Sequence, residues 1–434
     1  MFWIMNKKIL QIAFPAIVSN ITVPLLSLVD VAIVGHLGSP VYLGAIAVGG
    51  MLFSFIYWIF VFLRMGTSGM TSQALGRRDL PETMHLLLRS QAVALGVGVL
   101  LIALQVPITR LAFLFIHTTP EVQTWALRYF SICIWGAPAV LGLYGFAGWF
   151  VGMQNSRFPM WIAILQNVSN IVASLVLVFG LGLKVEGVAL GTVIAQYGGF
   201  GLAILLWCSY YRRLWHYLQP QRCWQRETLI RFFTLNRDIF LRTICLVLVT
   251  TSFTSVGAGL GEVVLAVNTL LMQFFTLFSY IMDGFAYSGE ALSGLYIGAG
   301  NRHALQRMIR LLFRWGFAVA ALFTGFYSLG SGAFLRLLTN EPSVVEASSA
   351  YLPWVWAIPV CGFAAFLWDG VLIGATATRM MLQAMLIASG SFAVVYVLLP
   401  ESWGNHALWL AFLCYLLLRG VASTLLGRRY LAIS

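Results

Sequence analysis

Charged side chains are scarce in this sequence. Of its 434 residues, only 9% are charged and 60% are hydrophobic, and the mean hydropathy is +0.88. A soluble globular domain carries about 25% charged residues. The composition therefore excludes a soluble protein and indicates one that lies mostly within a membrane.

Recognisable catalytic and metal-binding motifs are also lacking. The six cysteines are scattered, and no C-x-x-C pair or Cys/His group occurs. They are therefore expected to be small packing residues instead of metal ligands or disulfides. No nucleophile and base pair or phosphate-binding loop stands out either. We expect a protein that is not an enzyme and has no bound cofactor or metal.

What the sequence has instead is a series of long apolar segments. A helix of roughly 20 apolar residues crosses about 30 Å of hydrocarbon. The first segment is too long for a cleavable signal peptide and lacks a small-residue cleavage site. Twelve such segments fall near 9–34, 43–70, 90–116, 122–150, 160–183, 187–210, 239–260, 264–297, 311–337, 346–375, 380–400 and 404–426. The sequence predicts an all-α integral membrane protein with twelve transmembrane helices.

The basic residues predict the orientation of these helices. Most of the 26 Lys and Arg residues fall in loops on the side shared by both termini, and only Arg110, Arg128, Lys184 and Arg336 fall opposite. Since cytoplasmic loops are rich in Lys and Arg, both termini are predicted to be cytoplasmic. The net charge of +12 is then a topology signal, and no nucleic-acid partner is expected. The basic segment 211–237 could also touch anionic lipid.

The two halves of the chain repeat each other at an offset of 222 residues. The offset pairs Gly76 with Gly298, Tyr129 with Tyr351, Gly148 with Gly370, Gly152 with Gly374 and Arg157 with Arg379. This pattern indicates a duplication. It predicts an N-terminal six-helix lobe over residues 1–210, a basic cytoplasmic linker over 211–237 and a C-terminal six-helix lobe over 238–434. Transporters built from such repeats bind substrate between the halves.

Asp30 is the acid that stands out in the first apolar segment, which also contains Pro15 and Pro24. An ionisable group inside a membrane is costly, so it is a functional suspect by default. Burial favours the neutral form of a carboxyl group, which makes Asp30 a candidate proton carrier. Pro15 lacks a backbone donor and offers the same helix a hinge. The alternative is a purely structural, hydrogen-bonded Asp30.

Polar residues on the fifth and sixth segments lie at compatible depths. Asn167, Asn170 and Ser174 share one helix face, and Thr192 and Gln196 share another. They are predicted to form a proton-coupling site with Asp30. Such residues also hold membrane helices together, so simple packing is the alternative.

Three further acids mark the C-terminal half: Asp283, Glu290 and Asp369. Asp283 and Asp369 are each expected either to face substrate as a counter-charge or to pair with Arg64 or Arg242. Glu290 lies near the end of its segment, where an interfacial role is expected. Together the three form a candidate substrate site or polar site of the C-terminal lobe.

Several segments resemble a known family. FPAIVSNITVPLLSLVDVAIVGHLGSPVYLGAIAVG, LNRDIFLR, DGFAY and DGVLIGAT resemble the multidrug and toxic compound extrusion (MATE) transporters, specifically the DinF branch. The resemblance implies a V-shaped protein of two six-helix lobes in the bacterial inner membrane. It places the coupling acid at Asp30 and polar partners at Asn170 and Thr192. Family members commonly show N-I-x-x-D on the fifth helix, whereas this chain has Ser174 in place of the acid.

The resemblance implies a secondary active exporter of organic cations or amphiphiles, exchanged for protons, with a role in antibiotic resistance. Protonation of Asp30 would bend the first helix near Pro15 and release substrate. With one carboxylate fewer, Na⁺ coupling is less favoured, but it stays an alternative. A lipid-linked oligosaccharide flippase is a second alternative, and a non-transporting scaffold is a third. The expected partners are small molecules and the lipid bilayer, and a monomer is expected.

Overall fold

The computed structural model describes residues 2–36, 39–339 and 341–431. The described residues form helices joined by short connections, without strands. Eleven helices in this part of the chain are long and apolar enough to cross a membrane. The remaining predicted segment, 9–34, lies within the 34-residue helix α1 (Phe2–Gly35). The all-α membrane architecture is therefore confirmed.

The chain divides into two compact units. The N-terminal unit is Val18–Ile230, and the C-terminal unit combines Met1–Ile17 with Arg231–Ser434. The helix α1 thus begins in one unit and ends in the other. The predicted lobe boundaries put residues 1–17 with the N-terminal lobe, whereas this part of α1 packs on the C-terminal unit.

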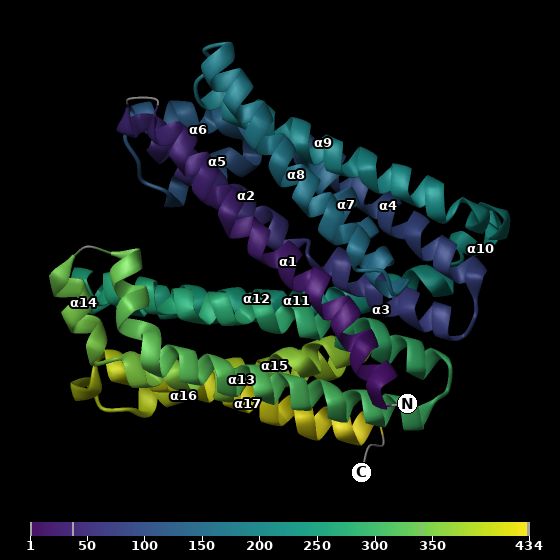
Figure 1. Cartoon of the computed structure of the whole chain (residues 1–434). Helices are drawn as coiled ribbons and strands as arrows, with labels where there is room; N and C mark the ends of the chain where they lie inside the picture. The colour runs from purple at the N-terminus through teal and green to yellow at the C-terminus, as the bar shows by residue number, and fades with distance from the viewer. Residues whose placement is uncertain (1, 37–38, 340, 432–434) are drawn as a thin grey trace. The chain divides into compact units, whose positions relative to one another are not determined.

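The N-terminal unit contains the second half of α1 and the helices that follow it (Figure 1). These are α2 (Pro40–Ile59), α3 (Phe62–Gly76), α4 (Leu80–Ala103), α5 (Gln105–Phe115), α6 (Pro120–Cys133), η1 (Ile134–Gly136), α7 (Ala137–Gly152), α8 (Arg157–Leu175), η2 (Val176–Gly180), α9 (Val185–Tyr210), η3 (Arg212–Tyr217) and α10 (Pro220–Cys223). The η3 and α10 turns form the linker, whose expected end at residue 237 already lies inside the next long helix.

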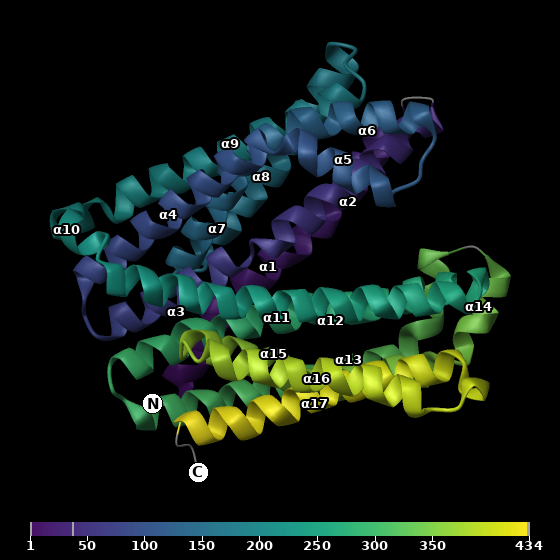
Figure 2. The same ribbon diagram turned by 180° about the vertical axis from the view of Figure 1, so that it is seen from behind.

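The C-terminal unit is a bundle of long helices, seen from behind in Figure 2. The long ones are α11 (Arg226–Gly259), whose first five residues belong to the N-terminal unit, α12 (Glu262–Gly298), α13 (Arg302–Leu338), α15 (Leu352–Gly374), α16 (Thr378–Leu398) and α17 (Asn405–Leu431). The short elements α14 (Pro342–Ser349) and η4 (Glu401–Trp403) connect them. The helix α15 is central and packs against α12, α13, α16 and α17. The described ends of α1 and α17 lie at the same end of this unit (Figure 1).

The predicted repeat is reproduced in the packing of the two central helices. A Cβ atom at Gly148 of α7 would overlap the carbonyl oxygen of Arg64, and one at Gly370 of α15 would overlap that of Ala286. Both partners are separated by the same 222 residues. Only glycine lets two backbones approach this closely. The repeat found in the sequence is therefore a repeat of helix-helix contacts.

Loop conformations repeat as well. Arg78 (φ 59°) and Gly300 (φ 66°) both adopt a left-handed backbone conformation, as do Gln154 (φ 65°) and Thr376 (φ 53°). Each pair is again 222 residues apart. The capping residue that follows the first pair is Asp79 before α4 and Asn301 before α13, and each accepts a hydrogen bond from a backbone N–H.

The outer faces of both units carry large apolar side chains. Val99 of the N-terminal unit is 61% exposed, and Leu329 of the C-terminal unit is 92% exposed. In a soluble protein such surfaces would aggregate, whereas in a membrane they face lipid. The polar residues described next lie inside the units.

Candidate functional site

Asp30 lies on the second half of α1, inside the N-terminal unit. Its side chain is half-buried. Its Oδ1 atom is buried and has no hydrogen-bond partner among the described residues. A buried carboxylate oxygen without a hydrogen-bond donor is energetically costly.

Tyr129 of α6 connects Asp30 to the rest of the site. The tyrosine side chain is buried and interacts with Asp30, with Cys133 and with Thr192 of α9. Cys133 interacts electrostatically with Asp30 as well. The sequence analysis paired Tyr129 with Tyr351 as a repeat position but did not assign it to the site. Its place against α2 and α9 follows from packing and has no signal in the local sequence.

Asn170 of α8 is the centre of a hydrogen-bond chain. Its Nδ2 donates to the hydroxyl of Thr192 across 3.1 Å, and its Oδ1 accepts from the hydroxyl of Ser174 across 3.3 Å. Thr192 in turn donates to the carbonyl oxygen of Val188. Asn170 is 1% exposed and Ser174 is fully buried. The predicted grouping of Asn170, Ser174 and Thr192 is thus present in the structure.

The close approach of α8 and α9 at this point depends on a glycine. A Cβ atom at Gly191 would overlap the Ser174 hydroxyl. The neighbouring Thr192 is thereby held within reach of Asn170. We refer to Asp30, Tyr129, Asn170, Ser174 and Thr192 as the Asp30 cluster.

Two other predicted members lie at its edges. The Nδ2 of Asn167 donates to the carbonyl oxygen of Thr22 on α1 across 3.1 Å, so it links α8 to the helix that carries Asp30. Gln196 is buried against Gly136 of η1. Its Oε1 atom has no hydrogen-bond partner in the described part of the chain. Asn167 therefore joins α1 to this region, whereas Gln196 is not hydrogen-bonded to Asn170 or Thr192 through that oxygen.

Pro15 lies on α1 close to the division between the two compact units. The division falls between Ile17 and Val18, two residues after the proline. A proline removes a backbone donor and weakens the helix at this place. The role of Pro15 as a hinge stays a prediction.

The C-terminal acids are arranged differently. Asp369 of α15 accepts hydrogen bonds from Arg242 of α11 and from Arg419 of α17. All three side chains are buried. Of the two expectations for Asp369, the structure shows the pair with Arg242. We refer to Arg242, Asp369 and Arg419 as the Asp369 cluster.

Asp283 and Glu290 lie on α12. Asp283 is half-buried and interacts electrostatically with Arg419 and with Tyr280. Glu290 is only 1% exposed, and its expected position near the membrane boundary stays a prediction. Its backbone carbonyl lies against Gly374 of α15, where α12 and α15 press together and cover it.

Arg419 was missed as an intramembrane residue. It lies inside the predicted apolar segment 404–426, seven residues before its end, and was expected among the basic residues of the cytoplasmic side. In the structure it is 2% exposed. The described chain buries four arginines, Arg64, Arg89, Arg242 and Arg419, and three acids, Asp238, Glu290 and Asp369.

Two repeated bundles of membrane-crossing helices, each with a buried polar cluster, define a membrane transporter fold of the inverted or parallel repeat class. The family model described as MatE matches residues 15–176 and again residues 239–399. The chain belongs to this family. The two matched regions correspond to the two halves of the repeat.

Curated relatives agree with this assignment. The chain is 38% identical over 426 residues to the DNA damage-inducible protein F of Escherichia coli, covering 98% of this chain and 92% of that protein. It is 23% identical over 358 residues to a probable multidrug resistance protein NorM of Thermotoga maritima, covering 79% of this chain and 74% of that protein. The predicted family and branch are confirmed.

Solved structures share the fold. A crystal structure of MATE in the bent conformation superposes with a TM-score of 0.87 at 19% identity, over 99% of this chain and 96% of the other. The bent form of the Vibrio cholerae MATE transporter VcmN superposes with a TM-score of 0.86 at 17% identity, over 99% and 98%. At these identities the likeness concerns the fold alone.

Proposed function

We propose that this protein exports organic cations or amphiphilic small molecules in exchange for protons, with Asp30 as the proton carrier. The observation that supports this most directly is the buried Oδ1 of Asp30, which lacks a hydrogen-bond donor among the described residues. The carboxylate form is costly there, and the neutral acid relieves that cost. Exchange of one proton at Asp30 therefore changes the charge of the whole cluster.

The neighbours of Asp30 suit a proton better than a metal ion. Amide and hydroxyl groups hydrogen-bond to either form of a carboxyl group, and Asn170 and Thr192 are already bonded to each other. Ser174 supplies a hydroxyl where family members commonly carry a second acid. A hard cation requires several oxygen ligands and benefits from their negative charge. Na⁺ coupling remains the second candidate, and the cluster gives it one carboxylate.

We further propose that α1 bends near Pro15 when Asp30 changes its protonation state. The helix carries the hinge in the part that packs on the C-terminal unit and Asp30 in the part that packs on the N-terminal unit. Asn167 bonds to the backbone of the same helix at Thr22. A change at Asp30 would therefore act on the part of α1 between its packing on the C-terminal unit and its hydrogen bond with Asn167. A relative in the same fold was described in a bent conformation.

The charges of the Asp369 cluster argue against an oligosaccharide flippase. A pyrophosphate cargo calls for uncommitted arginine or lysine side chains. Arg242 and Arg419 both bond to Asp369, and Asp283 adds a second negative charge near Arg419. This cluster is close to electrically neutral and offers no basic site for phosphate. The preference for cationic or amphiphilic cargo rests otherwise on the named relatives, among them a probable multidrug resistance protein.

We place the protein in the bacterial inner membrane as a multi-pass protein with both termini in the cytoplasm. The described ends of α1 and α17 lie at the same end of the C-terminal unit (Figure 1). The excess of basic residues on that side assigns it to the cytoplasm.

Uptake of a fluorescent organic cation into inverted membrane vesicles tests the proposed coupling. The vesicle interior corresponds to the cell exterior, so an acidic interior should drive accumulation of the dye. We expect accumulation with an imposed proton gradient and little with an imposed Na⁺ gradient. Accumulation driven only by Na⁺ would favour the second candidate, and failure with both gradients would overturn the proposed export of cations.

A further inference from the structure

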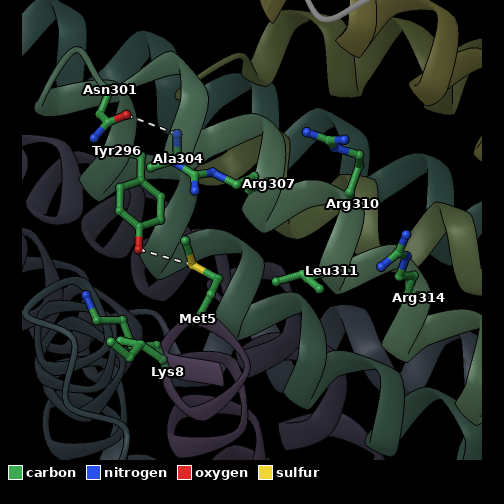
Figure 3. Close-up of a pocket in the computed structure, with 10 residues that line it drawn as sticks. Met5, Lys8, Tyr296, Asn301, Ala304, Arg307, Arg310, Leu311 and Arg314 are labelled. Atoms are coloured by element: carbon green, nitrogen blue, oxygen red, sulfur yellow. Dashed lines mark hydrogen bonds between the residues drawn. The ribbon is translucent and has the colours of Figure 1, made fainter. Parts of the chain in front are cut away.

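A basic cavity lies in the C-terminal unit, away from both polar clusters. Its volume is about 630 Å³. Figure 3 shows the side chains around it, with Met5 and Lys8 on α1 and the three arginines on α13. The residues that line it are Ile4, Met5, Lys8, Tyr296, Asn301, Ala304, Arg307, Arg310, Leu311 and Arg314.

The cavity combines four positive charges with apolar side chains. Lys8, Arg307, Arg310 and Arg314 line it, and neither Asp nor Glu is among its lining residues. The three arginines are spaced three and four residues apart on α13, so they share one helix face. Four like charges around one cavity repel one another unless an anion lies between them. The charge pattern therefore indicates an anionic ligand.

The walls of the cavity are fixed to one another. The hydroxyl of Tyr296 contacts the sulfur of Met5 at 3.3 Å. The indole of Trp315 donates to the Oδ1 of Asn6 across 3.0 Å, and Ser288 donates to the carbonyl of Ile9. These contacts hold the first turns of α1 on α12 and α13. The cavity is therefore held in shape by hydrogen bonds within this unit.

Its position along the helices corresponds to the lipid headgroups. The helix α13 has 37 residues, which is about 55 Å of helix and roughly 25 Å more than the hydrocarbon core. Its apolar run begins near Leu311, the run of α1 begins at Ile9, and that of α12 ends at Ile297. All three helices therefore leave the hydrocarbon at this cavity.

An apolar side chain lines the cavity, and an exposed one lies about one helix turn beyond it. Leu311 lines it, and Phe317, one turn beyond Arg314 on the same helix, is 58% exposed. A free aqueous anion gains no favourable contact from apolar side chains, whereas the acyl chain of a lipid packs against them. We propose that this cavity binds the phosphate group of an anionic phospholipid headgroup, held by Lys8, Arg310 and Arg314 with Arg307 beside them. Basic pockets between transmembrane helices bind anionic headgroups in this way.

Binding to the delipidated full-length protein tests the proposal independently of transport. Native mass spectrometry would follow titration with dioctanoyl phosphatidylglycerol, with the zwitterionic dioctanoyl phosphatidylcholine and with inorganic phosphate. We expect phosphatidylglycerol to bind about tenfold or more tightly than phosphatidylcholine. Binding of inorganic phosphate with equal affinity would show a site for a soluble anion and overturn the lipid assignment.

Charge-neutral variants assign the binding to this cavity. The triple variant Lys8→Gln, Arg310→Gln and Arg314→Gln should lose the preference for phosphatidylglycerol. The matched control removes three exposed charges outside the cavity and outside the basic segment 211–237, Arg110→Gln, Lys184→Gln and Arg336→Gln, and should keep it. If the triple variant fails to fold, the single variants Arg310→Gln and Arg314→Gln give the same comparison. Equal lipid preference in the cavity variants and the control would overturn the proposal.

Discussion

The amide of Asn170 on α8 donates a hydrogen bond to the hydroxyl of Thr192 on α9, 3.1 Å away. The same hydroxyl interacts with Tyr129, which in turn interacts with Asp30. Four helices of the N-terminal unit are thereby connected to one ionisable group. In the proposed mechanism, the cluster rearranges when Asp30 gains or loses a proton.

Replacing Thr192 tests whether this connection matters for transport. Thr192→Val keeps the shape but leaves the buried Asn170 amide without an acceptor, which costs about 1–3 kcal/mol. We expect a lower unfolding temperature in detergent and a several-fold lower rate of dye efflux. Thr192→Ser keeps the hydroxyl and should retain most of both. An equal loss of stability and efflux in the two variants would mean that the methyl group of Thr192, and not its hydrogen bond, supports transport.

Ser174 tests the preference for protons over Na⁺. Ser174→Asp adds a carboxylate next to Asn170, which supplies the charge and oxygens that a hard cation needs. We expect efflux by this variant to become dependent on a Na⁺ gradient, whereas Ser174→Ala should remain Na⁺-independent. Transport assays at fixed pH with and without Na⁺ measure the difference. If the aspartate variant transports at the wild-type rate with no response to Na⁺, the missing acid does not explain the coupling ion.

The repeat in the sequence corresponds to three-dimensional contacts because the duplication preserved the glycines at which two helix backbones come close together. Gly148 and Gly370 occur at equivalent positions, and each lies against a backbone carbonyl of the neighbouring helix. Spacing along the helices also placed Asn170, Ser174 and Thr192 together. Helical periodicity predicts on which side of its helix a residue lies. The repeat predicts which neighbouring helix packs against that side.

Other features depend on how the helices turn toward one another, which periodicity does not encode. Tyr129 joins Asp30 to Thr192 through the packing of α6, and its own segment gives no hint of that. Arg419 looked like a loop residue because it lies near the end of its apolar run, yet it bonds to Asp369 from another helix. Glu290 also lies near the end of its apolar segment and is covered by α15. Position along an apolar segment therefore does not predict whether neighbouring helices bury a side chain.

The central glycines should be equally sensitive in the two units. Gly148→Ala and Gly370→Ala each place a Cβ atom against a backbone carbonyl, which cannot rotate away. Overpacking of this kind costs about 1–3 kcal/mol, so both variants should unfold at lower temperature in detergent. Gly50→Ala and Gly390→Ala meet nothing within 4 Å and should be neutral or stabilising by up to about 1 kcal/mol. A destabilised control pair would show that helix propensity or lipid contact dominates instead.

The Asp369 cluster should be a structural element of the C-terminal unit. Asp369→Asn leaves the buried Arg242 and Arg419 without their shared counter-charge, and breaking a buried ion pair costs about 3–5 kcal/mol. We expect strongly reduced yield and thermal stability of the purified protein. Asp79→Asn changes an exposed helix cap that asparagine also satisfies, and it should behave like wild type. A stable Asp369→Asn protein with altered substrate selectivity would instead make Asp369 part of the substrate site.

Proton movement in proteoliposomes tests the proposed role of Asp30 most directly. Wild-type protein, Asp30→Asn and the control Asp79→Asn would be reconstituted at equal density around a trapped pH indicator, and a transported cation would then be added outside. The account predicts cation-dependent proton movement by the wild type and the control, and none by Asp30→Asn with intact thermal stability. Proton movement at the wild-type rate by Asp30→Asn would contradict it, because the coupling proton would then be carried by another group.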